Sequence, residues 1–130
     1  MGARLKYAKV VDRDLFLRTG AEVRPGLDNR VELHDEAPAK ANGFSVRREW
    51  YDVEGAFTES WRICDPHGRT LHEGLDREVI GGNDELVDDI DDLLFEYADA
   101  GYQLILSVDE REVARVDFDV VEPAPDGEAP

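Results

Sequence analysis

The strongest constraint on the fold is a strict alternation of apolar and polar residues near the end of the chain. Between residues 102 and 120, two segments place every second side chain on one apolar face, and a short polar segment separates them. The apolar positions are Tyr102, Leu104, Leu106, Val108, Ala114, Val116, Phe118 and Val120. A period of two is the pattern of a half-buried β-strand, because successive side chains point to opposite faces of a sheet. The sequence therefore predicts an antiparallel β-hairpin here.

A second hairpin is predicted over residues 58–74. Trp61 and Ile63 alternate with polar neighbours, and residues 65–68 have the sequence DPHG, which is typical of a type I turn. Shorter strands are expected at residues 30–35, 44–53 and 75–80. Within residues 44–53 the apolar positions change phase, which predicts a β-bulge.

Residues 84–99 are predicted to form an amphipathic α-helix. At about 100° per residue, the apolar side chains fall on one arc and the carboxylates on the opposite arc. The apolar set is Leu86, Ile90, Leu93, Leu94 and Tyr97. Asn83 is a suitable N-cap, and Gly101 stands where helices commonly end. The eight carboxylates between residues 83 and 101, with no Lys or Arg among them, are thus explained as a solvated helix face.

Together these elements predict a β-rich domain of the α+β class. The expected architecture is an antiparallel β-sandwich or half-open barrel built of hairpins. The helix of residues 84–99 precedes the final hairpin and is expected to cover one face or edge of the sheet.

Charge is distributed unevenly along the chain. Residues 1–30 carry 7 Lys or Arg and 4 Asp or Glu (net +3), whereas residues 31–130 carry 8 and 27 (net −19). This divides the chain into a basic N-terminal arm or strand region (1–30), a single acidic β-rich domain (31–121) and a tail (122–130) that we expect to be disordered. The basic region either folds back as a strand on its own body or reaches the acidic surface of a neighbouring copy.

The composition excludes some partners and compartments. A net charge of −16 argues against direct binding to nucleic acid or to anionic membranes. The excess of 12 Arg over 3 Lys fits either adaptation to a salt-rich cytoplasm or the codon usage of a GC-rich genome. No apolar run approaches the roughly 20 residues that span a bilayer, and the N-terminus lacks the apolar stretch of a secretory signal. With one cysteine in the chain, we expect a cytoplasmic protein or a component assembled in a virion.

Cys64, His67 and His72 are the cluster with metal-ligand chemistry. A fourth ligand is missing, and the simplest hairpin register, which pairs Cys64 with Arg69, places His72 on the opposite face. No phosphate-binding loop, dinucleotide-binding fingerprint or nucleophile elbow occurs in the sequence. We therefore predict no enzymatic activity, no cofactor and no metal site.

Phe95 lies at the centre of the acidic arc of the predicted helix, where two roles remain open. It either packs under a neighbouring loop, or it is an exposed anchor for a basic, partly apolar partner. In the second case the predicted contact residues are Phe95, Asp91, Asp92, Glu96 and Asp99, together with Lys6, Lys9 and Arg13 of the basic region.

Three functions remain open from the sequence. The first is a non-catalytic protein-interaction or assembly subunit, such as a virion component, that binds a protein partner or further copies of itself. The second is a small-ligand-binding or enzymatic β-sandwich with a pocket lined by Trp50, Tyr51, Trp61, Arg47, Arg48 and Arg62. The third is an acidic mimic of nucleic acid that inhibits a DNA-binding protein. A basic segment on an acidic body, without a catalytic motif, favours the first.

Overall fold

A computed structural model of the chain describes residues 4–14, 29–51, 55–80 and 85–123. Most of these residues belong to β-strands. The strands are β1 (Arg4–Asp12), β2 (Arg30–Glu32), β3 (Ala39–Lys40), β4 (Phe44–Tyr51), β5 (Ala56–Cys64), β6 (Thr70–Glu73), β7 (Arg77–Ile80), β8 (Glu85–Ile90), β9 (Leu94–Phe95), β10 (Ala100–Val108) and β11 (Arg111–Val121). The prediction of a β-rich domain is confirmed.

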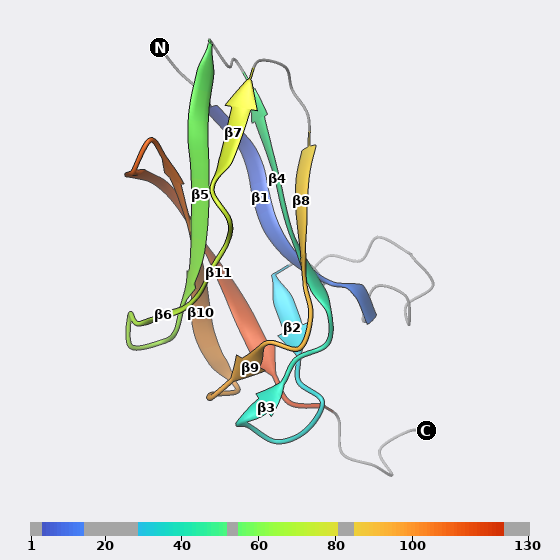
Figure 1. The fold of residues 1–130 in the computed structure, drawn as a ribbon. Coiled ribbons are helices and arrows are strands. Elements are labelled where there is room, and N and C mark those ends of the chain that lie inside the picture. Colours follow the sequence, from blue (N-terminus) through green and yellow to red (C-terminus); the bar gives the residue numbers. More distant parts are fainter. Residues whose placement is uncertain (1–3, 15–28, 52–54, 81–84, 124–130) are drawn as a thin grey trace.

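Nine of the strands form one mixed sheet that is not closed. Its order is β6-β5-β10-β11-β2-β1-β4-β8, and β7 pairs with β5 beside β6. The sheet curves so that β5, β10 and β11 lie opposite β1, β4 and β8 (Figure 1). β3 and β9 form a small separate sheet at one end. The expected antiparallel pairing holds except at β2, which pairs in parallel with both β1 and β11.

The core fills the space between the two halves of the sheet. Val10, Phe44, Val46 and Trp50 project into it from β1 and β4, and the opposite half contributes Phe57, Trp61, Ile63, Leu104, Leu106, Phe118 and Val120. The Trp50 ring packs against Phe57, with ring centroids 5.3 Å apart. Interdigitation of two inward-facing rows is the usual way in which facing sheets bury their apolar side chains.

The final hairpin follows the predicted alternation. β10 and β11 pair antiparallel, with Tyr102 opposite Phe118 and Leu104 opposite Val116. Asp109 and Glu110, which connect the strands, both have positive φ. Asp is among the residues that adopt this left-handed conformation more readily than most others do.

The hairpin of β5 and β6 also forms, around the predicted turn. The carboxylate of Asp65 accepts hydrogen bonds from two backbone amides of the turn, and Gly68 has a φ of 81°. The register differs from the simplest one, because an irregularity between Ile63 and Cys64 pairs Cys64 with Thr70.

The predicted α-helix over residues 84–99 is wrong. Residues 85–90 form the edge strand β8, which pairs antiparallel with β4 over six residue pairs (Figure 1). Partly buried and exposed positions alternate along β8, with Leu86, Asp88 and Ile90 on the inner side. β9 follows at Leu94–Phe95, and residue 84 lies outside the described residues.

The reason for this error is physical. Leu86 and Ile90 are four residues apart, which fits one face of a helix and also one face of a strand. Asp is a poor helix former, and a ladder with β4 supplies backbone hydrogen bonds that an isolated helix would have to supply itself. Asp88, which lies between these two apolar residues, also points inward. Its charge is stable there because the folded chain places Arg48 and Arg77 beside it. Asp92, with a φ of 58°, then ends the extended run.

β4 contains no bulge, contrary to the expectation for residues 44–53. Phe44, Val46, Arg48 and Trp50 are all buried, so the strand alternates without a change of phase. The irregularity lies on the neighbouring strand β1, close to Tyr7. Residues 52 and 53 lie outside the described residues.

Residues 4–12 of the basic N-terminal region form β1, which lies inside the sheet between β2 and β4. Val10 and Asp12 on this strand are 0% and 1% exposed. Of the two alternatives for the basic region, these residues therefore follow the first: they form a strand on the chain's own body. The rest of region 1–30 lies largely outside the described residues, as do residues 124–130 of the predicted tail.

Candidate functional site

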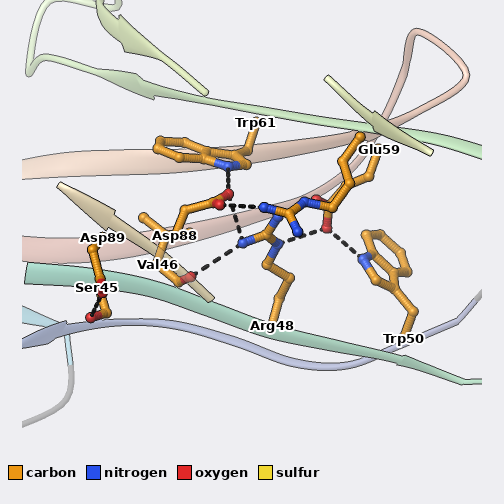
Figure 2. A network of polar contacts seen from close by, with 9 residues as sticks. Ser45, Val46, Arg48, Trp50, Glu59, Trp61, Asp88 and Asp89 are labelled. Atoms are coloured by element: carbon orange, nitrogen blue, oxygen red, sulfur yellow. Dashed lines mark hydrogen bonds and ion pairs between the residues drawn. The ribbon is translucent and has the colours of Figure 1, made fainter. Parts of the chain in front are cut away.

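Arg48 and Glu59 form an ion pair inside the core, between the two halves of the sheet. Both side chains are fully buried. Nε of Arg48 donates a hydrogen bond to Oε2 of Glu59 at 2.8 Å, and Nη2 contacts Oε1 (Figure 2). The indole Nε1 of Trp50 donates to Oε2 of Glu59 at 2.6 Å, and Nη1 of Arg48 donates to the carbonyl oxygen of Val46 at 3.3 Å.

Asp88 extends this network to the edge of the sheet. Its carboxylate accepts a hydrogen bond from Nε1 of Trp61 at 2.8 Å and lies 3.0 Å from Nη1 of Arg48 (Figure 2). On its outer side, Nη2 of Arg77 donates to it at 2.6 Å. Burial opposes ionisation of Asp88, but the hydrogen bond from Trp61 and the two guanidinium charges outweigh it and lower its pKa.

The charges of this network compensate one another. Arg48 and Arg77 supply two positive charges, and Glu59 and Asp88 supply two negative charges. Burial disfavours the charged form of Arg48, yet Glu59 and Asp88 together raise its pKa above the ordinary value. Each charge of the network thus faces a charge of opposite sign, which offsets the cost of removing it from water.

The network also joins the two edges of the open sheet. Among the described strands, β7 pairs only with β5 and β8 only with β4. The Arg77–Asp88 ion pair runs from β7 to β8, so side chains hold the edges together where backbone hydrogen bonds do not. The sheet is therefore open along a seam between these strands.

Two of the basic residues predicted to contact a partner are paired within the chain. Arg13 contacts the carboxylate of Asp91, and its Nη1 lies 4.0 Å from Asp89. Nζ of Lys6 lies 3.3 Å from the carboxylate of Glu49 on the neighbouring strand. The structure thus brings Arg13 together with one of the predicted acidic contact residues, but as an internal ion pair.

A second set of internal contacts joins side chains of the three neighbouring strands β1, β4 and β8. The hydroxyl of Tyr7 donates to the carboxylate of Glu85, which raises the pKa of Tyr7 to about 12. Arg47 donates to the other oxygen of Glu85 at 2.6 Å. These two hydrogen bonds, with the positive charges nearby, lower the pKa of Glu85. Nζ of Lys9 lies 5.4 Å from the centroid of the Tyr7 ring.

Phe95 is fully buried, so the packing alternative is the one that the structure shows. Its ring contacts Tyr102, Phe44 and Phe118, with centroid distances of 5.0, 6.1 and 6.5 Å. The side chain therefore has no surface to offer to a partner. The neighbouring candidates Asp91, Asp92, Glu96 and Asp99 are exposed.

Exposed apolar side chains occur on or beside both edge strands, β7 and β8, and on β9 of the small separate sheet. Leu75 is 88% exposed and Ile80 is 71% exposed, and both flank or belong to β7. Val87 on β8 and Leu94 on β9 are 41% and 48% exposed. Of the five large apolar side chains that are exposed in the described residues, these four lie between residues 75 and 94, and the fifth is Val113 on β11.

A hollow of about 210 Å³ lies next to the break between β6 and β7. It is lined by Ser60, Trp61, Arg62, Glu73, Gly74, Asp76, Ile105, Ser107 and Glu110. Ile105 points away from the main core, yet it is only 2% exposed. It forms part of the floor of this hollow. The volume is below the range of about 300–1,000 Å³ that holds drug-sized ligands, so the hollow suits a single side chain.

The Cys/His cluster does not converge. Cys64 is buried, His67 packs against Tyr97 with ring centroids 5.2 Å apart, and His72 packs against Trp61 at 5.7 Å. The described residues hold no group of three His, Cys, Asp or Glu side chains arranged to bind a metal ion.

Sequence reasoning missed the roles of Arg48, Glu59 and Asp88. A signal was present, because each of the three stands at the inward phase of its strand. Glu59 lies two residues after Phe57 and two before Trp61, so it shares their face of the strand. Arg48 lies in the same way between Val46 and Trp50. Charges of opposite sign at core positions of two strands indicate a pair that meets across the core.

No helix among the described residues is both long and apolar enough to cross a membrane. No protein-family model matches the chain, and the comparison with curated proteins finds no significantly similar sequence.

Proposed function

We propose that the protein is a non-catalytic interaction or assembly subunit that binds a protein partner through the open edges of its sheet. The observation that carries the proposal is that exposed apolar side chains lie on or beside both edge strands. These are Leu75 and Ile80 at β7 and Val87 on β8.

Edges of this kind favour association with another chain. An edge strand presents backbone donors and acceptors that a partner can satisfy, and natural proteins normally protect them. Apolar side chains beside such an edge add contact area from which water is released on binding. The ion pair of Arg77 and Asp88 bridges β7 and β8, but no backbone ladder joins these two described strands.

The alternative with an interior ligand pocket receives less support. Arg48 and Trp50, which would line such a pocket, are 0% and 2% exposed and both donate hydrogen bonds to Glu59. Their polar atoms are thus already used within the core.

A capture experiment tests the proposed function. The full chain, immobilised at one end, is exposed to an extract of the source organism in parallel with the variant Leu75→Ser/Ile80→Thr and the control Val113→Thr. We expect the same discrete partner on the wild-type and control chains, and its loss from the double variant, because Val113 lies on another hairpin.

Light scattering of the purified chain at moderate and molar salt completes the test by detecting self-association. The proposal fails if the wild-type chain neither retains a partner nor oligomerises. It also fails if all three chains behave alike.

A further inference from the structure

We infer that the edge formed by β6 and β7 binds a basic, extended segment of a partner protein, with one Lys or Arg side chain in the hollow beside residues 73–76. The inference rests on the proposed function and specifies the partner's chemistry. Four observations carry it: the free edge, the break in that edge, the hollow and the charge around them.

β6 and β7 together form one interrupted edge. Both pair with β5, β7 along its first half and β6 along its second half. In the described residues neither strand has a backbone ladder on its other side, where the side chain of Arg77 on β7 reaches Asp88 on β8. A peptide that adds as a further strand gains backbone hydrogen bonds along such an edge, and pockets for alternate side chains select its sequence.

The break between β6 and β7 is built by Gly74. The amide of Gly74 donates to the carbonyl oxygen of Trp61 at 2.9 Å, and a Cβ at this position would overlap the Trp61 indole. The chain therefore lies against Trp61 before it resumes as β7. The hollow opens at this point, so it is accessible to a side chain of a segment lying along the edge.

The chemistry of the hollow suits a long cationic side chain. Its floor includes Ile105, against which an aliphatic stem can pack, and its rim includes three carboxylates. Glu73, Asp76 and Glu110 supply three negative charges against the one positive charge of Arg62, a net of −2. None of the four has an ion-pair partner within the described part of the chain.

The edge itself continues this charge and adds apolar surface. Glu78 on β7 is exposed, as are Leu75 and Ile80 on either side of it. Because Glu78 and Ile80 lie on the same face of β7, an added strand that alternates basic and apolar residues would place its basic side chains on the face of Glu78 and its apolar side chains on the opposite face.

The same charges disfavour a second copy of this chain as the occupant. A two-fold contact between two such edges brings each patch against its own equivalent. Glu73, Asp76 and Glu78 of one copy would then face the same carboxylates of the other, and like charges across a ladder are destabilising.

The first test uses a defined peptide as the probe. Acetyl-Lys-Val-Lys-Val-Lys-Val-amide is titrated into the isotopically labelled full chain at about 0.15 M salt, and backbone amide shifts are followed by NMR. We expect saturable shifts at residues 70–80 and at Ser60, Arg62 and Ser107. A peptide of the same sequence with alternate amides N-methylated keeps the charge but cannot complete the ladder, and we expect it to bind at least about tenfold more weakly.

Matched variants separate this site from general attraction to an acidic protein. Glu73→Gln/Asp76→Asn should weaken binding at least about fivefold, through the loss of two partly exposed ion pairs. The control Glu36→Gln/Glu96→Gln removes the same charge from exposed positions elsewhere and should leave Kd within about twofold.

Several results would overturn the inference. Equal binding of the N-methylated peptide, equal losses in both double variants, or shifts confined to residues 85–92 would each exclude strand addition at this edge. A salt-resistant dimer that disappears in Leu75→Ser/Ile80→Thr would assign the edge to a second copy. In that case, or if the capture experiment succeeds while the peptide fails, the interaction function stands and the basic segment is rejected.

Discussion

Arg48 occupies a position at which the alternation of β4 requires a core side chain. A buried guanidinium is stable there only because every strong partner is already in place: Glu59, Asp88 and the Val46 carbonyl oxygen. Removal of one partner leaves a charge that cannot reach water, and this is more costly than the pair is favourable. The residue that carries the opposite charge is therefore the sensitive point of the core.

Glu59→Gln is expected to lower the free energy of unfolding by about 3 kcal/mol, as is typical of a broken buried pair in which another counter-charge remains. Glutamine keeps an acceptor for Trp50 but leaves Arg48 with only Asp88 as a counter-ion. Urea unfolding measures the loss, and Glu112→Gln, which breaks the solvent-exposed pair with Arg115, should change stability far less because water screens that pair. Equal effects of the two substitutions would contradict a structural role for the buried network.

Asp88 connects stability to acidic pH. Its folded pKa lies below the ordinary value, whereas in the unfolded chain it titrates near about 3.9. The stabilisation is therefore complete above about pH 4 and is lost as the pH falls through the folded pKa. The carboxylate must be ionised to pair with Arg48 and Arg77.

Asp88→Asn is expected to be less stable than the wild-type chain at neutral pH and to lose less further stability between about pH 4 and pH 2. Urea midpoints measured for both chains across this range provide the comparison. The other carboxylates titrate in both, so the difference between the curves isolates Asp88. Parallel curves would show that Asp88 contributes no pH-dependent stability.

At the scale of single elements, the break between β6 and β7 depends on one glycine. Gly74 lies against the Trp61 indole, which itself reaches Asp88 across the seam. A methyl group at residue 74 would push the indole away from Asp88 or displace the edge strand. Gly101, on β10, has open space where a Cβ would stand.

Gly74→Ala should cost about 1–3 kcal/mol of stability by overpacking. Gly101→Ala should be neutral or slightly stabilising, since it reduces the entropy of the unfolded chain. Thermal or urea unfolding of the two variants distinguishes them. If both have the same small effect, the close packing of Gly74 on Trp61 is not required for the fold.

β9 contains only two residues, yet it delivers a large apolar side chain to the core. Phe95 enters the aromatic cluster with Phe44, Tyr102 and Phe118, whereas its neighbour Leu94 is 48% exposed. The two residues of one short strand thus have opposite environments, as a period of two requires.

Phe95→Ala is expected to lower the free energy of unfolding by about 3–5 kcal/mol, because it leaves a cavity among aromatic rings. Leu94→Ala should cost less than about 1 kcal/mol. Equilibrium unfolding gives both values. A Phe95→Ala variant that keeps its stability but loses partner binding would contradict the buried position of this side chain.

For the whole molecule, the net charge of −16 sets a balance between internal pairs and self-repulsion. Lys6 of β1 and the adjacent Arg13 reduce the repulsion locally, since they pair with the carboxylates of Glu49 and Asp91. Much of the remaining acidic surface is exposed, where dissolved salt screens it.

The melting temperature is therefore expected to rise from low to molar KCl. Screening of net self-repulsion predicts this sign, and the buried Arg48–Glu59 pair is screened far less than surface charges are. Calorimetry across the salt series measures the effect. A flat or falling curve would contradict adaptation of this surface to salt.

The sequence alone predicts those elements whose signal is local. The hairpin of β10 and β11 follows from a period of two sustained over both strands, and the turn at residues 65–68 follows from DPHG. These features depend on backbone geometry and on residues adjacent in the chain, so no distant partner is needed to specify them. The β-rich class follows for the same reason.

Tertiary structure decided the features that depend on partners far along the chain. Residues 85–90 fit both a helical and a strand period, and pairing with β4, about 40 residues earlier, selected the strand. The register of β5 with β6, the parallel pairs of β2 and the burial of Phe95 were also set by packing. Arg48, Glu59 and Asp88 belong to three different strands, and each charge is tolerated in its position only because the fold places the others within hydrogen-bond distance of it.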